Sequence, residues 1–444
     1  MAEQSLASTA PLRNEAENKR SRSGIGAMFI IGLLFFIFGF VTWLNGTLIP
    51  FLKLALQLKT DIQAFFVTFA FYMAYFFLAI PSSYILKGTG YKNGMALGLL
   101  IMAIGSILFI PAATTRSFGL FLTGLFIQGT GLALLQTASN PYVSILGPIE
   151  SAAKRISIMG ICNKTAGALS PLILGAIVLK GASKIEGQIN TATSISDKEN
   201  LLQELSSRII VPYLVIAIVL LGLAIFIKKS TLPEVEAEEE EASLTDAPAK
   251  TSVFQFPHLL LGVLCLFLYV GVEVMAGDAI GIYGRTIGIT LDKTRYFTSF
   301  TLVAMLVGYV IGVFTIPKII SQQTALKLSA ILGIVFTLAV FVSTGYTAIT
   351  FIALLGLANA LMWPAIFPLA ISGLGKFTKI GSALLIMGIA GGALIPLLYG
   401  VLKQLPSVGN TMAFIICMLP CYVYILYYSA YGYKSGKKQY RLST

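Results

Sequence analysis

The sequence has little charge and few of the residues that soluble enzymes use. Only 11% of its 444 residues are charged, and it contains a single histidine. A soluble globular protein has about 25% charged residues, so this composition excludes a water-soluble enzyme and a nucleic-acid-binding module. Four cysteines in so long a chain also exclude a small secreted domain held by disulfides.

Apolar residues dominate instead and make up 56% of the chain. At about 20 residues per bilayer crossing, that is enough for about twelve membrane-spanning helices. Apolar runs of helix length lie near residues 27–51, 61–86, 94–113, 118–145, 156–179, 210–227, 258–283, 295–317, 325–343, 347–371, 380–402 and 410–431. The sequence therefore predicts an all-α integral membrane protein.

Three long polar segments interrupt these runs and set the expected domains. We predict a disordered cytoplasmic tail, an N-terminal six-helix bundle, a cytoplasmic linker, a C-terminal six-helix bundle and a cytoplasmic tail, at residues 1–24, 25–227, 228–256, 257–432 and 433–444. The acidic run at 238–241 is typical of a solvated tether. The remaining polar segment, 181–208, lies within the N-terminal bundle, where leucines at helical spacing predict a short helix on the outer surface.

The net charge of +12 fits this topology. With the N-terminus inside, the basic residues concentrate in the cytoplasmic segments, as the positive-inside rule requires. Both termini are therefore expected in the cytoplasm, and anionic headgroups of the lipid bilayer are the expected partners of the bases.

An internal repeat relates the two halves. AGALSPLILG at 166–175 and GGALIPLLYG at 391–400 share glycine, alanine, leucine and proline at the same positions. FGFVTWLNG and VGVEVMAGD align through Gly39 and Gly271. Parallel repeats of six helices build transporters that rock around a site near the bilayer midplane, so we expect a major facilitator fold. No GxxxxGK[ST] loop of an ATP-driven pump is present, and nothing resembles a channel filter.

Three ionisable residues fall inside the predicted spans: Lys164, Glu273 and Asp278. Ionisable groups are expensive in a membrane, so each is a functional candidate. Asp278 lies beside Gly277 and Gly281, where a bent helix would expose backbone oxygens suited to a small hard cation such as sodium, or to a proton relay.

Each of these residues also has a structural interpretation. Asp278 could lie solvated at the outer mouth, paired with Arg285, and Glu273 could form a structural hydrogen bond. Lys164 could be locked against either acid, or it could compete with an ion for one of them. The cysteines and His258 show no metal or redox framework.

Neutral polar residues inside the spans suggest a sugar site. Amides offer a donor and an acceptor side by side, which suits vicinal hydroxyls, and an aromatic face covers the apolar side of a pyranose ring. The candidates are Gln136, Asn140, Asn163, Asn45, Asn359, Trp43 and Trp363. Structural amides between helices are the competing interpretation of each one.

Three motifs carry a family resemblance: FGFVTWLNGTLIPFLK (38–53), LLQTASNPYVSILGP (134–148) and YVGVEVMAGDAIGIYG (269–284). With them the chain resembles the fucose–proton symporter family of major-facilitator sugar transporters, in the branch of bacterial glucose/galactose transporters and N-acetylglucosamine permeases. That resemblance implies a location in the bacterial inner membrane.

The chain departs from the proton-coupled fucose members of that family at two acids. Where those members have the acidic residues of the motifs LND and LETAANP, this chain has Gly46 and Gln136, and neither residue can carry a proton. Gln136 looks like the variant of sodium-coupled hexose members. The repeat alignment places Gly46 opposite Asp278, and Lys164 has no counterpart in the fucose members.

These observations predict a transporter with no enzymatic activity and no cofactor beyond its coupling ion. We expect sodium-coupled symport of a neutral hexose of the glucose, galactose or mannose type by a monomer. Asp278 would hold sodium, aided by Asn45 or Glu273. The amides at 136, 140, 163 and 359 would bind the sugar, with Trp43 or Trp363 stacked on its ring. The alternatives are a proton-coupled symporter of fucose or N-acetylglucosamine, an uncoupled facilitator, and a sugar sensor.

Overall fold

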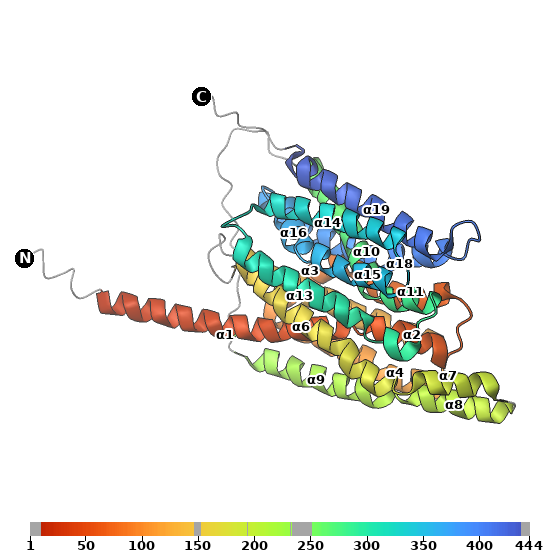
Figure 1. Cartoon of the computed structure of the whole chain (residues 1–444). Coiled ribbons are helices and arrows are strands. Elements are labelled where there is room, and N and C mark those ends of the chain that lie inside the picture. The colour runs from red at the N-terminus through yellow and green to blue at the C-terminus, as the bar shows by residue number, and fades with distance from the viewer. Residues whose placement is uncertain (1–9, 146–151, 193, 231, 233–250, 437–444) are drawn as a thin grey trace, which may run out of the picture.

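The computed structural model describes residues 10–145, 152–192, 194–230, 232 and 251–436, and all regular elements in these residues are helices (Figure 1). The first half contains α1 (Ala10–Thr42), α2 (Asn45–Ala55), α3 (Asp61–Ile107), α4 (Phe109–Thr114), α5 (Phe118–Ile145), α6 (Ala152–Val178), α7 (Ala182–Thr191), α8 (Ile195–Ser207) and α9 (Ile210–Lys229). The second half contains η2 (Val253–Gln255), α10 (Pro257–Gly277), α11 (Ile280–Thr286), α12 (Leu291–Thr294), α13 (Phe297–Thr315), α14 (Gln322–Val342), α15 (Gly345–Asn359), α16 (Met362–Ile371), η3 (Gly375–Phe377), α17 (Thr378–Met387), η4 (Gly388–Ala390), α18 (Gly391–Leu402), α19 (Gly409–Ala430) and η5 (Gly432–Lys434).

Within the described residues, eleven helical segments are long and apolar enough to cross a membrane. One of them, Asp61–Thr114, has 54 residues. At about 1.5 Å per residue, it would measure about 80 Å if straight, more than twice the roughly 30 Å of a hydrocarbon core. Gly90 interrupts it with φ at 73°, which folds the segment into two crossings. The predicted all-α architecture of twelve spans is therefore found.

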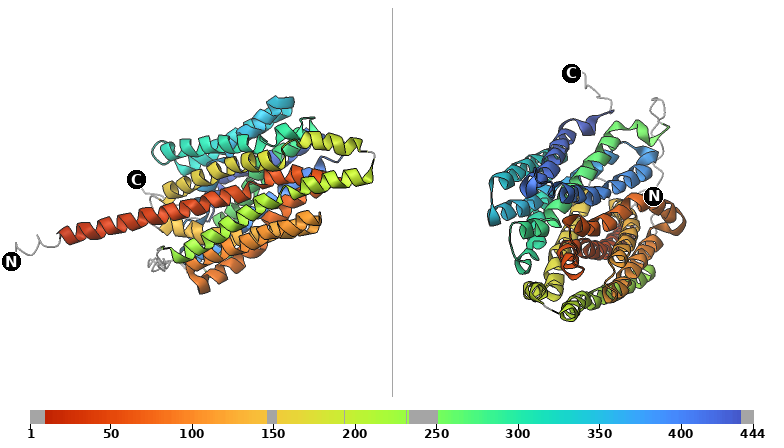
Figure 2. Two further views of the ribbon diagram at one scale, coloured as in Figure 1. Left: turned by 90° about the horizontal axis from the view of Figure 1, so that it is seen from below. Right: turned by 90° about the vertical axis from the view of Figure 1, so that its right-hand side faces the viewer.

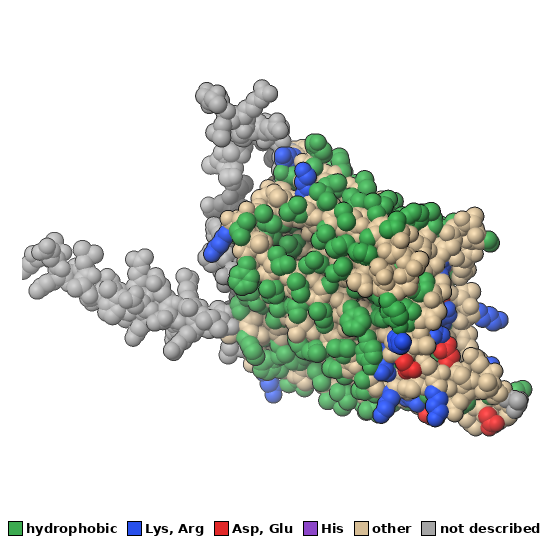
Figure 3. Space-filling view, in the orientation of Figure 1, with side chains coloured by type: hydrophobic (Ala, Val, Ile, Leu, Met, Phe, Trp, Pro, Cys, Tyr) green, Lys and Arg blue, Asp and Glu red, His purple; other side chains and the backbone are tan. Residues whose placement is uncertain are grey.

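Charge and helix ends define the two faces of the bundle. The beginning of α1 and the ends of α9 and α19 lie at one end, whereas α7 and α8 lie at the other (Figure 1). Apolar side chains cover the middle of the visible face, and charged side chains gather near α7 and α8 (Figure 3). An apolar belt with charged ends is what a bilayer requires, because hydrocarbon solvates neither charges nor free backbone groups.

The three polar segments compare differently with the sequence prediction. α1 begins at Ala10, inside the segment 1–24 for which we predicted a disordered tail. The predicted outer helix is present as α8, with Leu202 and Leu205 buried, and α7 precedes it. The acidic run at 238–241 lies outside the described residues.

The two halves lie side by side (Figure 2). They meet along two interfaces, α6 against α13 and α3 against α17 and α18. Glycines let spans approach within each half: a Cβ on Gly39 would lie 1.8 Å from the carbonyl oxygen of Asn163, and one on Gly391 would lie 1.7 Å from that of Phe267. Such contacts bring backbones together, as small residues do in membrane bundles.

We predict that Gly39→Ala destabilises the protein by about 2 to 3 kcal/mol, because the added methyl group must separate α1 from α6. Thermal unfolding in detergent measures the effect as a lowered midpoint. Gly222→Ala on α9 is the matched control, since a Cβ there meets nothing within 4 Å. Equal midpoints for the two variants would contradict the close approach.

Candidate functional site

Two equivalent spans of the repeat are each interrupted by a short break. α1 ends at Thr42 and α2 begins at Asn45, while α10 ends at Gly277 and α11 begins at Ile280. The predicted span 27–51 is thus two helices, and the bend expected at Gly277 is present. Helix ends release backbone carbonyls that need partners.

Threonines of α13 supply partners for two of these carbonyls at the second break. Thr298 Oγ1 donates to the carbonyl of Gly277 at 2.7 Å, and Thr301 Oγ1 donates to that of Ala276 at 2.8 Å. Both threonines are buried. The second break is therefore held in a fixed geometry by its neighbour.

Lys164 and Glu273 form an ion pair between the halves. Lys164 Nζ on α6 donates to Glu273 Oε1 on α10 at 2.8 Å, and the side chains are only 8% and 10% exposed. Of the two acids that we considered as partners of this lysine, Glu273 is the one it contacts. A buried charge is tolerated when a partner of opposite charge is hydrogen-bonded to it.

Trp43 supports this ion pair from the first break. Lys164 Nζ lies 4.6 Å from its ring centroid, a cation–π distance. A Cβ on Gly167 would lie 2.5 Å from the indole, and one on Gly277 would lie 2.2 Å from it. The ring is therefore wedged between the fifth and seventh spans and is only 2% exposed.

Asp278 lies at the second break and is fully buried. The alternative of an outer, solvated position paired with Arg285 is wrong, because Arg285 pairs with Glu186. The backbone of Gly46, the repeat equivalent of Asp278, lies next to the carboxylate. Neither carboxylate oxygen is within hydrogen-bonding geometry of a described group.

The first half places its amides on α5 and α6. Gln136 Nε2 donates to the hydroxyl of Tyr75 at 3.0 Å, and Asn163 Nδ2 donates to the carbonyl of Phe35 at 3.3 Å. Both amides are partly exposed although they lie within spans, whereas Asn140 is 9% exposed. Asn163 directly precedes Lys164 on α6, so the amide lies at the same level of the membrane as the ion pair but on a different side of the helix.

The second half places Trp363 near the same ion pair. Trp363 is partly exposed, and its ring stacks on Phe367 and lies 6.5 Å from Tyr269, one helical turn before Glu273. Asn359 is fully buried and accepts a hydrogen bond of 2.8 Å from the hydroxyl of Tyr422. Asn45 is also buried, and its Nδ2 has no partner among the described residues.

Tyrosines are the residues of this region that the sequence patterns missed. Tyr75 and Tyr422 each bind one of the predicted amides, and Tyr269 contacts both the ring of Trp363 and the carboxylate of Glu273. Only Tyr269 could have been found from the sequence. It lies four residues before the intramembrane acid Glu273 and therefore shares a helix face with it. The partners of the other two lie on distant spans.

We predict that Glu273→Gln destabilises the protein by about 3 to 5 kcal/mol, because it leaves the ammonium of Lys164 buried without a counter-charge. The double variant Lys164→Met/Glu273→Gln should recover most of this loss. Thermal unfolding in detergent measures both. Glu204→Gln is the control, because its exposed pair with Arg208 is worth only about 0.3 to 0.5 kcal/mol. A double variant no more stable than Glu273→Gln would refute the pairing.

Comparison with known proteins gives the same architecture over most of the chain. The glucose/galactose transporter of Brucella abortus (strain 2308) is 33% identical over 97% of this chain and 99% of its own. The L-fucose-proton symporter of Escherichia coli is 28% identical over 88% of this chain and 89% of its own. A crystal structure of FucP in the outward conformation matches with a TM-score of 0.70 and 26% identity, over 92% of this chain and 99% of that one. The family model described as Major Facilitator Superfamily matches residues 31–397. The chain therefore belongs to the Major Facilitator Superfamily.

Proposed function

We propose that the protein is a secondary active transporter that takes up a neutral hexose with sodium by alternating access. Its relatives are named glucose/galactose transporter and L-fucose-proton symporter, which supports a sugar as the substrate. We further propose that it lies in the bacterial inner membrane with both termini in the cytoplasm, as the distribution of its bases predicts.

The proposed sugar site spans both halves. Gln136, Asn140 and Asn163 would bind hydroxyls from the first half, and Asn359 would do so from the second. The partial exposure of Trp363 favours it over Trp43 as the ring that covers the sugar, because Lys164 and two glycines already surround Trp43. The position of Trp363 near Tyr269 would bring the sugar close to Glu273.

The single observation that carries the coupling proposal is the buried carboxylate of Asp278, which forms no ion pair among the described residues and lies beside the backbone of Gly46. Lys164 and Glu273 neutralise each other, so the three intramembrane charges sum to one negative charge on Asp278. A buried carboxylate without a cationic partner is unfavourable. One monovalent cation would neutralise it, and oxygen ligands suit sodium.

Of the two residues proposed to bind sodium together with Asp278, Asn45 is better placed than Glu273. It flanks Gly46, whose backbone lies next to the Asp278 carboxylate, whereas Glu273 is occupied by Lys164. Sodium bound at Asp278 would improve the affinity for sugar, and by thermodynamic linkage sugar would improve the affinity for sodium by the same factor.

Proton coupling is the second candidate, and the names of the L-fucose-proton symporters favour it. In that case the proton would reside on Asp278, because a protonated carboxyl also removes the unpaired charge. Gly46 and Gln136 cannot carry it. The two candidates thus share a residue and differ in the ion.

We predict that purified protein in liposomes accumulates radiolabelled glucose or galactose when an inward sodium gradient is imposed. A proton gradient of equal size, without sodium, should leave only equilibration. Empty liposomes and excess unlabelled sugar are the controls. Accumulation that follows the proton gradient and ignores sodium would replace the first candidate with the second. Equilibration under both gradients would leave a facilitator.

We predict that Asp278→Asn abolishes accumulation but preserves exchange of labelled for unlabelled sugar. The amide removes the charge that attracts the cation, whereas the sugar ligands stay in place. Gradient-driven uptake should fall by about tenfold or more, as expected when a coupling free energy of about 1.4 kcal/mol or more is lost. Asp197→Asn, an exposed acid on α8, is the control. Unchanged accumulation would exclude Asp278 as the ion ligand.

A further inference from the structure

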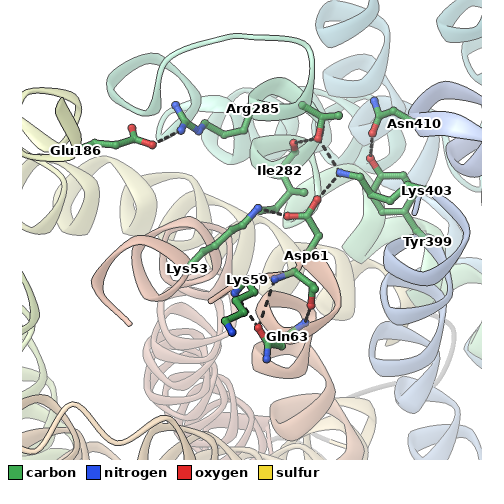
Figure 4. Close-up of polar contacts among 12 residues, drawn as sticks. Lys53, Lys59, Asp61, Gln63, Glu186, Ile282, Arg285, Tyr399, Lys403 and Asn410 are labelled. Carbon is green, nitrogen blue, oxygen red and sulfur yellow. Dashed lines mark hydrogen bonds and ion pairs between the residues drawn. The ribbon is translucent and has the colours of Figure 1, made fainter. Parts of the chain in front are cut away.

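Ion pairs join the two halves at the outer end of the bundle (Figure 4). Asp61 at the start of α3 holds two lysines at once. Its Oδ1 accepts from Lys53 of the first half, and its Oδ2 accepts from Lys403 Nζ of the second half at 2.6 Å. A single carboxylate thus connects the second span to the residue that follows the eleventh span.

Lys403 is held in place from several sides. Its Nζ also donates to Thr286 Oγ1 on α11 at 2.6 Å and lies 5.4 Å from the ring centroid of Tyr399, and its side chain is only 6% exposed. Burial lowers the pKa of Lys403, and the carboxylate of Asp61 opposes that shift. Charge-assisted hydrogen bonds in such shielded positions are stronger than surface ion pairs.

A second set of contacts closes the same end along the other interface. Arg285 Nη2 on α11 donates to Glu186 Oε1 on α7 at 2.5 Å. Arg295 Nη1 donates to the carbonyls of Gly175 and Leu179 at 3.3 and 3.2 Å. Each of these bonds also joins one half to the other.

The outer ion pairs are linked to the breaks at the centre of the membrane. Lys53 lies in the last turn of α2 and Arg285 in the last turn of α11. These two short helices pack against each other and start at the breaks that flank Asp278. The alignment that pairs Gly39 with Gly271 also pairs Lys53 with Arg285, so the repeat places a cation at the end of each.

We propose that Asp61 and Lys403, reinforced by Arg285 and Glu186, form the outer gate of this transporter. Alternating access requires the halves to separate on the outer side before substrate can enter, and these bonds must then break. The structure has them formed and is therefore closed to the outside. The inference rests on the alternating-access transport proposed above and is independent of the coupling ion.

The test measures the gate directly, without sugar or a gradient. In a cysteine-free background that retains sugar exchange, spin labels are placed at two exposed outer positions, Lys59→Cys and Ser407→Cys. A second labelled variant has them at two exposed positions of the inner end, Lys87→Cys and Lys327→Cys. Double electron–electron resonance then reports the distance between halves at each end.

We expect Asp61→Asn to lengthen the outer distance and shorten the inner one, raising the ratio of outward-open to outward-closed protein by about tenfold, which corresponds to about 1.4 kcal/mol. Lys403→Gln should give the same shift, because it removes the same bond while Asp61 keeps Lys53. Glu199→Gln is the matched control, since Glu199 pairs with Arg116 inside the first half.

The two single variants also distinguish a gate from a merely structural contact. A gate predicts a lower half-saturation concentration for sugar added outside, whereas a structural contact predicts a lower unfolding temperature with unchanged distances. Unchanged distances in both variants, with exchange intact, would overturn the gate but not the proposed transport. A wild-type protein that exchanges no sugar would instead refute the proposed function.

Discussion

The ion pair between Lys164 and Glu273 is the contact on which the centre of this structure depends. Neither charge would be stable alone among apolar spans, and the partners come from different halves, α6 and α10. Trp43 lies against the ammonium group and fills the space left by Gly167 and Gly277. The pair therefore fixes the level at which the fifth and seventh spans meet, and Trp43 brings the first break against the same point.

The repeat gives the two halves similar frames and different chemistry. The close approach of Gly39 to the fifth span has a counterpart in the approach of Gly391 to the seventh. The equivalent positions Gly46 and Asp278 differ, and they cannot be exchanged freely. A Cβ on Gly46 would lie 2.2 Å from Thr298 Oγ1, the hydroxyl that holds the carbonyl of Gly277. One half therefore supplies the carboxylate, and the other supplies the bare backbone that lies against it.

Hydropathy predicted most of the fold, because a membrane-spanning helix is defined by its length and apolar composition. The three intramembrane charges were also visible in the sequence, since so few residues there are ionisable. The sequence could not identify the partner of Lys164, because the choice between Glu273 and Asp278 depends on how α6 lies against α10. The break at Trp43 has no proline beside it, and the tyrosines that bind Gln136 and Asn359 come from spans far away in sequence. Local patterns carry no information on such contacts.

The lone carboxylate of Asp278 has an electrical consequence. A carrier whose three intramembrane charges sum to minus one becomes neutral when one cation binds, whether that cation is sodium or a proton. In the proposed symport, each uptake cycle with an uncharged sugar would move one positive charge inward and return an empty carrier with a negative site. The membrane potential adds about 2.3 kcal/mol per 100 mV to such a cycle. The voltage of the cell would therefore drive accumulation together with the ion gradient, even where that gradient is small.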